Sequence, residues 1–350
     1  MSKLILSGTN GYSSGDGHDA SPVLLAPGGQ PVSRPSDAES SNIVLPFRTG
    51  PRVFDEVAKP EYIAPYFPEG ALIDLFGLPK EAGKTTFVLS LTNALLHGAP
   101  FMGGPTQQTP VVYLTEQGPG VFKVSAEKAG LYTADGLHVL HKYDLVKLGL
   151  GWEEVAGLTI EHAVATGAKV VFIDTFAAFA DMVDENSAPE AYRLFRPLSA
   201  AQEHDITVVV IRHERKGGGS LIGGARGSTG FTGQADIIAR LSRVSRAPAN
   251  HRLFEVTGRF DTDEVYVAFD GATYELVDDP TSAKTQTLNL LRKHDEAMTV
   301  NEVYSGLQKR GYTFGDTTVR NALSDLVDNG DVEKRSLPGK GSPQGYRAVV

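Results

Sequence analysis

The sequence contains no cysteine, which excludes disulfide bonds and metal sites built from thiolates. Its nine histidines show no H-x-x-x-H spacing of the kind that ligates zinc. No apolar run approaches the roughly 20 residues that span a bilayer. The apolar stretch in the opening MSKLILSGTNGYSSG is too short for a secretory signal. We therefore expect a cytoplasmic protein with no membrane segment and no metalloenzyme centre.

Acidic residues outnumber basic ones, but the imbalance is uneven along the chain. The net charge is -9, whereas residues 281–350 hold 10 Lys and Arg against 8 Asp and Glu. A tail more basic than its body weakly favours contact with nucleic acid. Residues 1–50 are rich in Gly, Ser, Pro and Asp without a sustained period, which predicts a disordered arm.

The middle of the chain alternates short apolar strands with helical stretches. Strands are predicted at 71–76, 111–115, 169–174 and 206–211, and helices at 84–97, 152–166 and 190–204. Strands this apolar, separated by helices, indicate a mostly parallel sheet covered on both faces. Residues 252–260 and 264–270 are expected to continue it in antiparallel fashion. We assign residues 51–278 to this α/β domain.

A different pattern follows a linker at 279–284. Residues 285–294 predict a short helix, Thr299 to Glu302 is a capping box that opens a second, and Asp316 or Thr317 can cap a third. Two short strands then flank PGKGSPQG. Three helices and a hairpin within residues 285–350 are the layout of a winged helix-turn-helix domain.

The stretch GLPKEAGKTT resembles a phosphate-binding loop with one residue more than G-x-x-x-x-G-K-[ST]. It follows a predicted buried strand and opens a helix, as that motif requires. Backbone N–H groups there would form an anion nest, Lys84 would reach the β- and γ-phosphates of ATP, and the Thr85 hydroxyl would bind Mg²⁺. The predicted nucleotide-binding residues are Gly77, Pro79, Ala82, Gly83, Lys84, Thr85 and Thr86. A Rossmann site is excluded because no G-x-G-x-x-G opens the helix.

Three further side chains follow predicted strands and could complete the site. Asp174 ends the strand 169–174 and is the expected magnesium carboxylate. Glu116 ends another strand, where a carboxylate could deprotonate the attacking water. His213 follows the fourth strand, where it could sense the γ-phosphate.

Basic residues beyond that strand suggest contacts with DNA or a neighbouring subunit. The stretch from Glu214 to Gly230 is rich in glycine and carries Lys216 and Arg226. Arg259, at a predicted strand end, is a candidate arginine finger that would act in an adjacent subunit, with Arg226 as the competing candidate.

The order of these motifs resembles the RecA-fold ATPases of the RepA/KaiC/DnaB-like group, especially RepA-type replicative helicases, over about residues 52–275. That resemblance implies that Lys84 and Thr85 bind Mg-ATP, that Glu116 is the catalytic base, and that His213 couples the γ-phosphate to DNA-binding loops. It also implies a homo-oligomer, commonly a hexameric ring with ATP between subunits. The family's finger motif often reads Lys-x-Arg, but Thr257 replaces the lysine here.

The tail resembles winged-helix DNA-binding domains, whose third helix enters the major groove. Arg320, Asn321 and Ser324 would face outward on that helix, and Lys340 would lie in the wing. Asp325 and Asp328 share the helix and would repel phosphates.

Three functions are compatible with these patterns. The first is a ring-forming, ATP-driven DNA motor or replicative helicase of a plasmid or phage. The second is a RecA-like recombination ATPase, and the third is an ATP-switched regulator that binds an operator or a protein partner.

Overall fold

The computed structural model describes residues 49–50, 60–132, 135–183, 187–214, 229–259, 262–338 and 342–349. The chain divides into two units, residues 1–58 and 59–350, and nearly all described residues belong to the second. The predicted arm lies almost wholly outside the described residues.

Among the described residues, nine strands form one sheet in the order β11-β10-β9-β8-β3-β7-β6-β4-β5. Six of them run parallel to one another and the last three in sequence are antiparallel, which confirms the predicted mostly parallel sheet. A separate small hairpin, β1 (Tyr62–Ala64) with β2 (Phe67–Pro68), precedes them. The strands of the sheet are β3 (Leu72–Gly77), β4 (Val111–Thr115), β5 (Leu137–His141), β6 (Val170–Asp174), β7 (Thr207–His213), β8 (Ile237–Arg243), β9 (His251–Gly258), β10 (Thr262–Phe269) and β11 (Tyr274–Val277).

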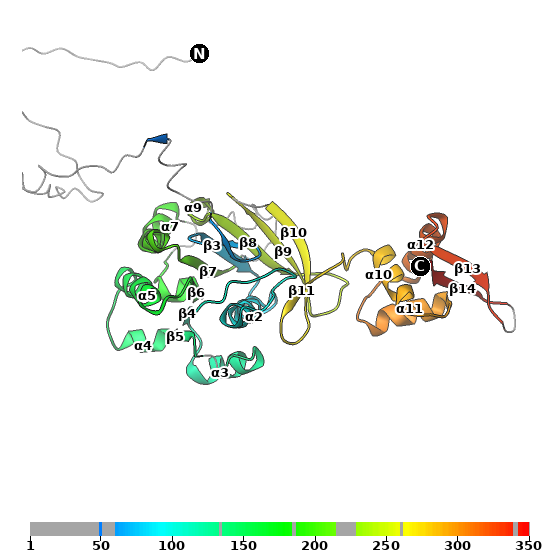
Figure 1. The fold of residues 1–350 in the computed structure, drawn as a ribbon, viewed down its shortest axis with the longest axis horizontal. Helices are drawn as coiled ribbons and strands as arrows, with labels where there is room; N and C mark the ends of the chain where they lie inside the picture. Colours follow the sequence, from blue (N-terminus) through cyan, green and yellow to red (C-terminus); the bar gives the residue numbers. More distant parts are fainter. Residues whose placement is uncertain are drawn as a thin grey trace, which may run out of the picture. The chain divides into compact units, whose positions relative to one another are not determined.

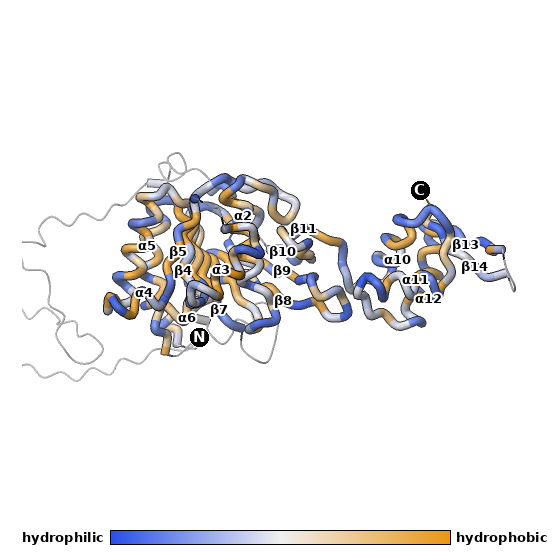
Figure 2. The backbone as a smooth tube through the Cα atoms, turned by 90° about the horizontal axis from the view of Figure 1, so that it is seen from below, coloured by the Kyte–Doolittle hydropathy of each residue, from blue (hydrophilic) through white to orange (hydrophobic). Residues whose placement is uncertain are grey.

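Both faces of this sheet are buried, which explains its continuous apolar runs. Along β7, Val208 and Val210 enter one core cluster, whereas Val209 and Ile211 enter the other. Successive side chains of a strand point to opposite faces, so a strand buried on both must be apolar throughout. Figure 2 shows the hydrophobic colour concentrated in these central strands.

Helices cover the two faces (Figure 1). On one face lie α2 (Lys84–His97) and α3 (Pro119–Lys128), which contribute Phe87, Leu91 and Phe122 to the core. The other face is covered chiefly by α5 (Trp152–Thr166), α6 (Phe176–Phe179), α7 (Ala188–Phe195) and the 3-10 segment η2 (Arg196–His204), and the short helices α4 (Lys142–Val146) and α9 (Thr229–Gln234) lie between strands in the sequence. No described helix is long and apolar enough to cross a membrane.

Three details of this sheet and its helices differ from the sequence prediction. The apolar runs do not predict strands β5 and β8, because LHVLH and IIARLSR alternate apolar and polar residues and are only partly buried. The predicted helix 190–204 is in fact α7 followed by η2. Pro197 lacks an N–H and cannot continue an α-helical ladder, which accounts for the change near Arg196.

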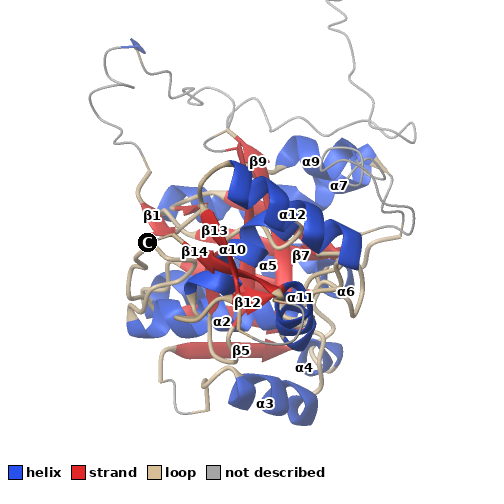
Figure 3. Ribbon diagram, turned by 90° about the vertical axis from the view of Figure 1, so that its right-hand side faces the viewer, coloured by secondary structure: helices blue, strands red, loops and turns tan. Residues whose placement is uncertain are grey.

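Residues 283–348 form three helices and a small sheet (Figure 3). Thr299 and Glu302 make the predicted capping box. Leu290, Val303 and Leu323 are buried in a core of their own. The elements are α10 (Ala283–Arg292), β12 (Met298–Thr299), α11 (Val300–Lys309), α12 (Asp316–Asp328), β13 (Val332–Ser336) and β14 (Gln344–Ala348), with sheet order β12-β14-β13.

Candidate nucleotide-binding site

The loop between β3 and α2 begins and ends at glycines that the geometry requires. A Cβ on Gly77 would lie 2.3 Å from the Leu241 carbonyl oxygen and 2.8 Å from the Ala82 Cβ. Gly83 has φ 77°, a left-handed conformation in which an L side chain is strained. The loop accommodates its additional residue through a tight turn in which Lys80 takes φ 60° and the Glu81 N–H donates to the Pro79 carbonyl at 2.8 Å.

The Lys84 ammonium is buried inside this loop. Its Nζ donates to the carbonyl oxygens of Gly77 at 2.6 Å and Leu78 at 3.3 Å, and lies 3.4 Å from His213 Nδ1. Burial lowers the pKa of Lys84 to about 8, although the nearby carboxylates of Asp174 and Glu214 act to raise it. The structure thus brings together Lys84 and His213, two candidate site residues that are 129 positions apart in the chain.

Thr85 and Asp174 lie together at the same end of the sheet. The Thr85 hydroxyl donates to Asp174 Oδ2 at 2.8 Å, and the buried Tyr113 hydroxyl donates to the same oxygen at 3.0 Å. Burial raises the pKa of the Asp174 carboxyl, while the hydrogen bonds from Thr85 and Tyr113 oppose that shift. Hydroxyl and carboxylate oxygens are ligands that Mg²⁺ prefers, so Thr85 and Asp174 fit the ion.

Glu116 stands beside them on the adjacent strand. Its backbone N–H donates to the Asp174 carbonyl at 2.8 Å, and its Oε2 accepts from the Thr175 hydroxyl at 2.8 Å. The residue is otherwise exposed. A solvent-facing acid held at the carboxyl end of β4 is positioned to act on a water beside bound phosphates.

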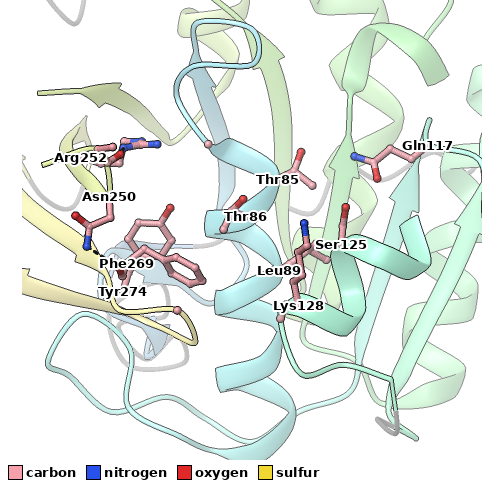
Figure 4. Close-up of a pocket in the computed structure, with 14 residues that line it drawn as sticks. Thr85, Thr86, Leu89, Gln117, Ser125, Lys128, Asn250, Arg252, Phe269 and Tyr274 are labelled. Carbon is pink, nitrogen blue, oxygen red and sulfur yellow. Dashed lines mark hydrogen bonds between the residues drawn. The ribbon is translucent and has the colours of Figure 1, made fainter. Parts of the chain in front are cut away.

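The helix N-terminus opens onto a cavity of about 670 Å³ (Figure 4). Thr85, Thr86 and Leu89 of α2 lie between two walls. One wall comes from the Gln117 loop and α3, and the other from the antiparallel strands. The residues that line these walls are Gln117, Ser125, Lys128, Asn250, Arg252, Phe269 and Tyr274, among others. A cavity of this size, next to a phosphate loop and with aromatic rings on one side, suits a nucleoside.

Arg252 is a site residue that sequence reasoning missed. Its Nε donates to the Ala82 carbonyl at 2.7 Å, and its Nη1 donates to the carbonyls of Ala249 and His251. The guanidinium lies against Gly83, and burial lowers the pKa of Arg252. The sequence pattern predicts the strand that carries Arg252. However, the register that brings its side chain to the phosphate loop is set by antiparallel pairing with β8, a strand that the apolar runs do not predict.

The candidate arginine finger Arg259 lies at the opposite end of the parallel strands. Its Nη1 is 3.4 Å from Asp236 Oδ1, and the second carboxylate oxygen of Asp236 accepts from the N–H of Leu72, where β3 begins. Arg259 therefore does not reach the loop of its own chain, and its action in an adjacent subunit stays a prediction. Arg226 and Lys216 lie outside the described residues.

The predicted DNA-contacting residues of α12 are exposed, but one is already paired. Arg320 Nε donates to Asp316 Oδ2 at 2.6 Å within the same helix. Asn321 and Ser324 are exposed to solvent, as are Asp325 and Asp328. Lys340 lies outside the described residues.

The profile of the family described as "AAA domain" matches residues 54–219 of this chain, slightly less than half of it. No match was found among curated proteins. The fold is similar to the ATPase domain of a DnaB-like helicase, with a TM-score of 0.45, 13% identity, and coverage of 60% of this chain and 86% of that one. The RadB recombinase gives 0.43, 19%, 60% and 92%, and a KaiC-like protein of Pyrococcus horikoshii OT3 gives 0.43, 14%, 60% and 91%. Because these TM-scores are below 0.5, the site is interpreted from its own geometry.

The family match and the geometry agree on a coarse identification. A mostly parallel sheet, a phosphate loop between strand and helix, and a carboxylate at the end of a second strand fit a RecA-like P-loop ATPase. This part of the chain is an ATP-binding domain.

Proposed function

We propose that this protein is an ATP-hydrolysing DNA motor, of the ring-forming type found in plasmid and phage replicative helicases. The observation that supports hydrolysis most strongly is the convergence of Lys84, Thr85, Glu116, Asp174 and His213 at one edge of the sheet from four separate segments. Binding ATP alone needs the loop; an exposed carboxylate next to the metal position adds the means to cleave it.

Each residue has a proposed part in that chemistry. The N–H groups around Ala82 and Gly83 hold the phosphates, with Lys84 supplying positive charge. Thr85 and Asp174 hold Mg²⁺, which when bound neutralises charge on the phosphate oxygens. Glu116 orients and deprotonates water, and His213, in contact with Lys84, responds to the γ-phosphate.

The domain assignment belongs to the same proposal. Residues 51–278 would be the motor domain, 279–284 a linker and 285–350 a winged-helix domain, whose helix and strand order the described C-terminal elements match. The expected partners are DNA, as a single strand or duplex, and further copies of this chain, with a hexamer as the expected ring.

An ATP-switched regulator is the second candidate, and the charge of α12 favours it. That helix carries Asp316, Asp325 and Asp328 against the single cation Arg320, which suits docking to a protein better than to phosphates. A recombination ATPase would share the motor's site and differ in the absence of strand separation.

ATP turnover by the full-length protein, alone and with single-stranded or duplex DNA, tests the proposal. We expect DNA to stimulate turnover and Lys84→Ala to reduce it by roughly 10²-fold or more, as for loss of one preorganised charge in an active site. Undiminished hydrolysis by Lys84→Ala would refute the site, and turnover indifferent to DNA would favour the regulator. Unwinding of a forked duplex separates a helicase from a recombinase.

A further inference from the structure

A second cavity, of about 960 Å³, adjoins the nucleotide pocket within the unit 59–350. One wall is formed by residues 248–251 and 276–278, and the other by α10 and the end of α11. Asn250 lines both this cavity and the nucleotide pocket. Three cationic side chains project from the second wall: Arg292, Lys293 and Arg310.

These three cations are available to a ligand. They are exposed, and none forms an ion pair with another side chain in the described part of the chain. The single carboxylate in the lining, Asp278, accepts a hydrogen bond from Asn289 Nδ2 at 2.9 Å. In a chain of net charge -9, three unpaired cations against one carboxylate are a local excess rather than a general property of the surface.

The positive lining continues beyond this cavity. Arg310 also lines a neighbouring pocket of about 470 Å³, together with His294, Lys309 and the polar side chains of Asn301 and Ser305. Glu302 in that pocket is occupied by the hydrogen bonds of its capping box with Thr299. We call the two pockets, joined at Arg310, the cationic groove. Its length exceeds what one phosphate group requires.

Direct contacts hold the two walls together. The Thr313 N–H donates to the Arg246 carbonyl at 3.2 Å, and the Tyr312 ring meets the His251 ring with centroids 6.1 Å apart. Gly311 has φ 88° and packs against Pro248, where an added Cβ would approach to 3.3 Å. The groove is thus built from residues distant in sequence that pack against one another.

We propose that the cationic groove binds the phosphate backbone of a nucleic-acid strand, an inference that rests on the proposed DNA motor and gives its partner a location. An extended line of unpaired cations and side-chain amides matches a chain of phosphates, whereas a single phosphate would use only part of it. The groove differs from the contacts expected from sequence, which lie on α12 and in the loop 214–230.

The groove also connects this ligand to the nucleotide. Asn250 and His251 form its wall, and the next residue, Arg252, donates to the Ala82 carbonyl of the phosphate loop. A strand held against His251 therefore lies one residue from the side chain that positions the loop. Nucleic acid in the groove is expected to change the affinity for ATP.

Binding of labelled oligonucleotides of about 20 bases, single-stranded and duplex, to the full-length protein tests the proposal; this length exceeds the 4–16 nucleotides that one module typically covers. The variant is Arg292→Gln, Lys293→Gln and Arg310→Gln combined. The matched control is Lys123→Gln, Lys147→Gln and Arg196→Gln, which removes three exposed cations outside the groove. Fluorescence anisotropy without ATP, between about 50 and 200 mM salt, gives affinity and its salt dependence.

We expect the groove variant to lose about tenfold or more in affinity for at least one strand form, and its slope of log K against log salt to shrink by about 2, since each lost phosphate contact removes roughly 0.7–0.9. The control should match the wild type. Wild-type affinity and slope in the groove variant would overturn the proposal, as would loss of tripolyphosphate binding with DNA binding intact, which indicates a small-anion site. Arg310→Glu alone, with an unchanged melting temperature, guards against a folding defect in the triple variant.

The two proposals can fail separately. Normal ATP turnover by Lys84→Ala would remove the motor while leaving a groove that still binds DNA. Normal DNA binding by the groove variant would remove the groove while the ATPase site stands.

Discussion

The phosphate-loop edge of the sheet and helix α12 both carry charged residues that sequence analysis selects, yet they use them differently. At the sheet edge, Lys84, Asp174 and His213 interact with partners from other segments of the chain. On α12, Arg320 pairs with Asp316 four residues away in its own helix. A site assembled across segments leaves its groups directed at a common centre, whereas a local pair consumes the cation that a ligand would need. Substitutions at both places test this contrast.

The largest expected effect is at Glu116. Replacing it by Gln keeps the hydrogen-bonding shape but removes the base, so ATP turnover should fall by about 10²–10⁴-fold. Affinity for Mg-ATP should change little, because Glu116 lies beside the loop and outside it. Turnover assays together with equilibrium nucleotide binding check this, and a residual rate near that of the wild type would show that another group activates water.

The next effect concerns Gly77, where β3 enters the loop. Gly77→Ala forces a Cβ to 2.3 Å from the Leu241 carbonyl oxygen, so we expect a loss of about 1–3 kcal/mol in the free energy of unfolding, as for overpacking. Gly157→Ala in α5 is the control, because nothing lies within 4 Å of its Cβ, and it should stabilise the helix by about 0.5–1 kcal/mol. Urea denaturation compares the two, and equal effects would contradict the proposed backbone contact.

A third effect follows from the lowered pKa of Lys84. Below pH 7 the free protein carries an ammonium there, and above its pKa of about 8 the amine becomes neutral and loses its attraction for phosphates. ATP affinity should therefore fall with rising pH, by up to about tenfold per unit above pH 8. Titration with a non-hydrolysable ATP analogue measures this. Lys84→Arg, which stays charged, should show no such dependence, and a flat wild-type profile would place the titrating group elsewhere.

The smallest expected effect is on α12. Because Arg320 is engaged by Asp316 and three carboxylates share its helix, Arg320→Gln should change duplex DNA affinity by no more than about twofold. Asp316→Asn, which frees Arg320, should if anything strengthen binding. Anisotropy with duplex DNA tests both, and a tenfold loss in Arg320→Gln would restore α12 as the DNA-reading helix and erase the contrast with the sheet edge.

Much of the fold is predictable because the strands next to the site are buried on both faces. Continuous apolar runs identify β3, β4, β6 and β7, and the periodicity predicts helix α5 with its observed bounds. Strand β8 escapes prediction because Arg240, Ser242 and Arg243 interrupt its apolar pattern, and β5 because it lies at the sheet's edge. The helix after residue 188 changes type near Pro197, which periodicity alone does not indicate.

The phosphate loop, the candidate magnesium carboxylate and the strand-end acid can all be read from the amino-acid sequence, because each belongs to a short contiguous pattern in which a buried strand ends at a polar residue. Three other features become visible only in the folded chain. Arg252 reaches the loop, Arg259 lies at the far end of the strands, and Arg292, Lys293 and Arg310 meet along one groove. These features arise from strand register and from packing between distant elements. They depend on how β8, β9 and the C-terminal helices fit together, and no local pattern encodes that fit.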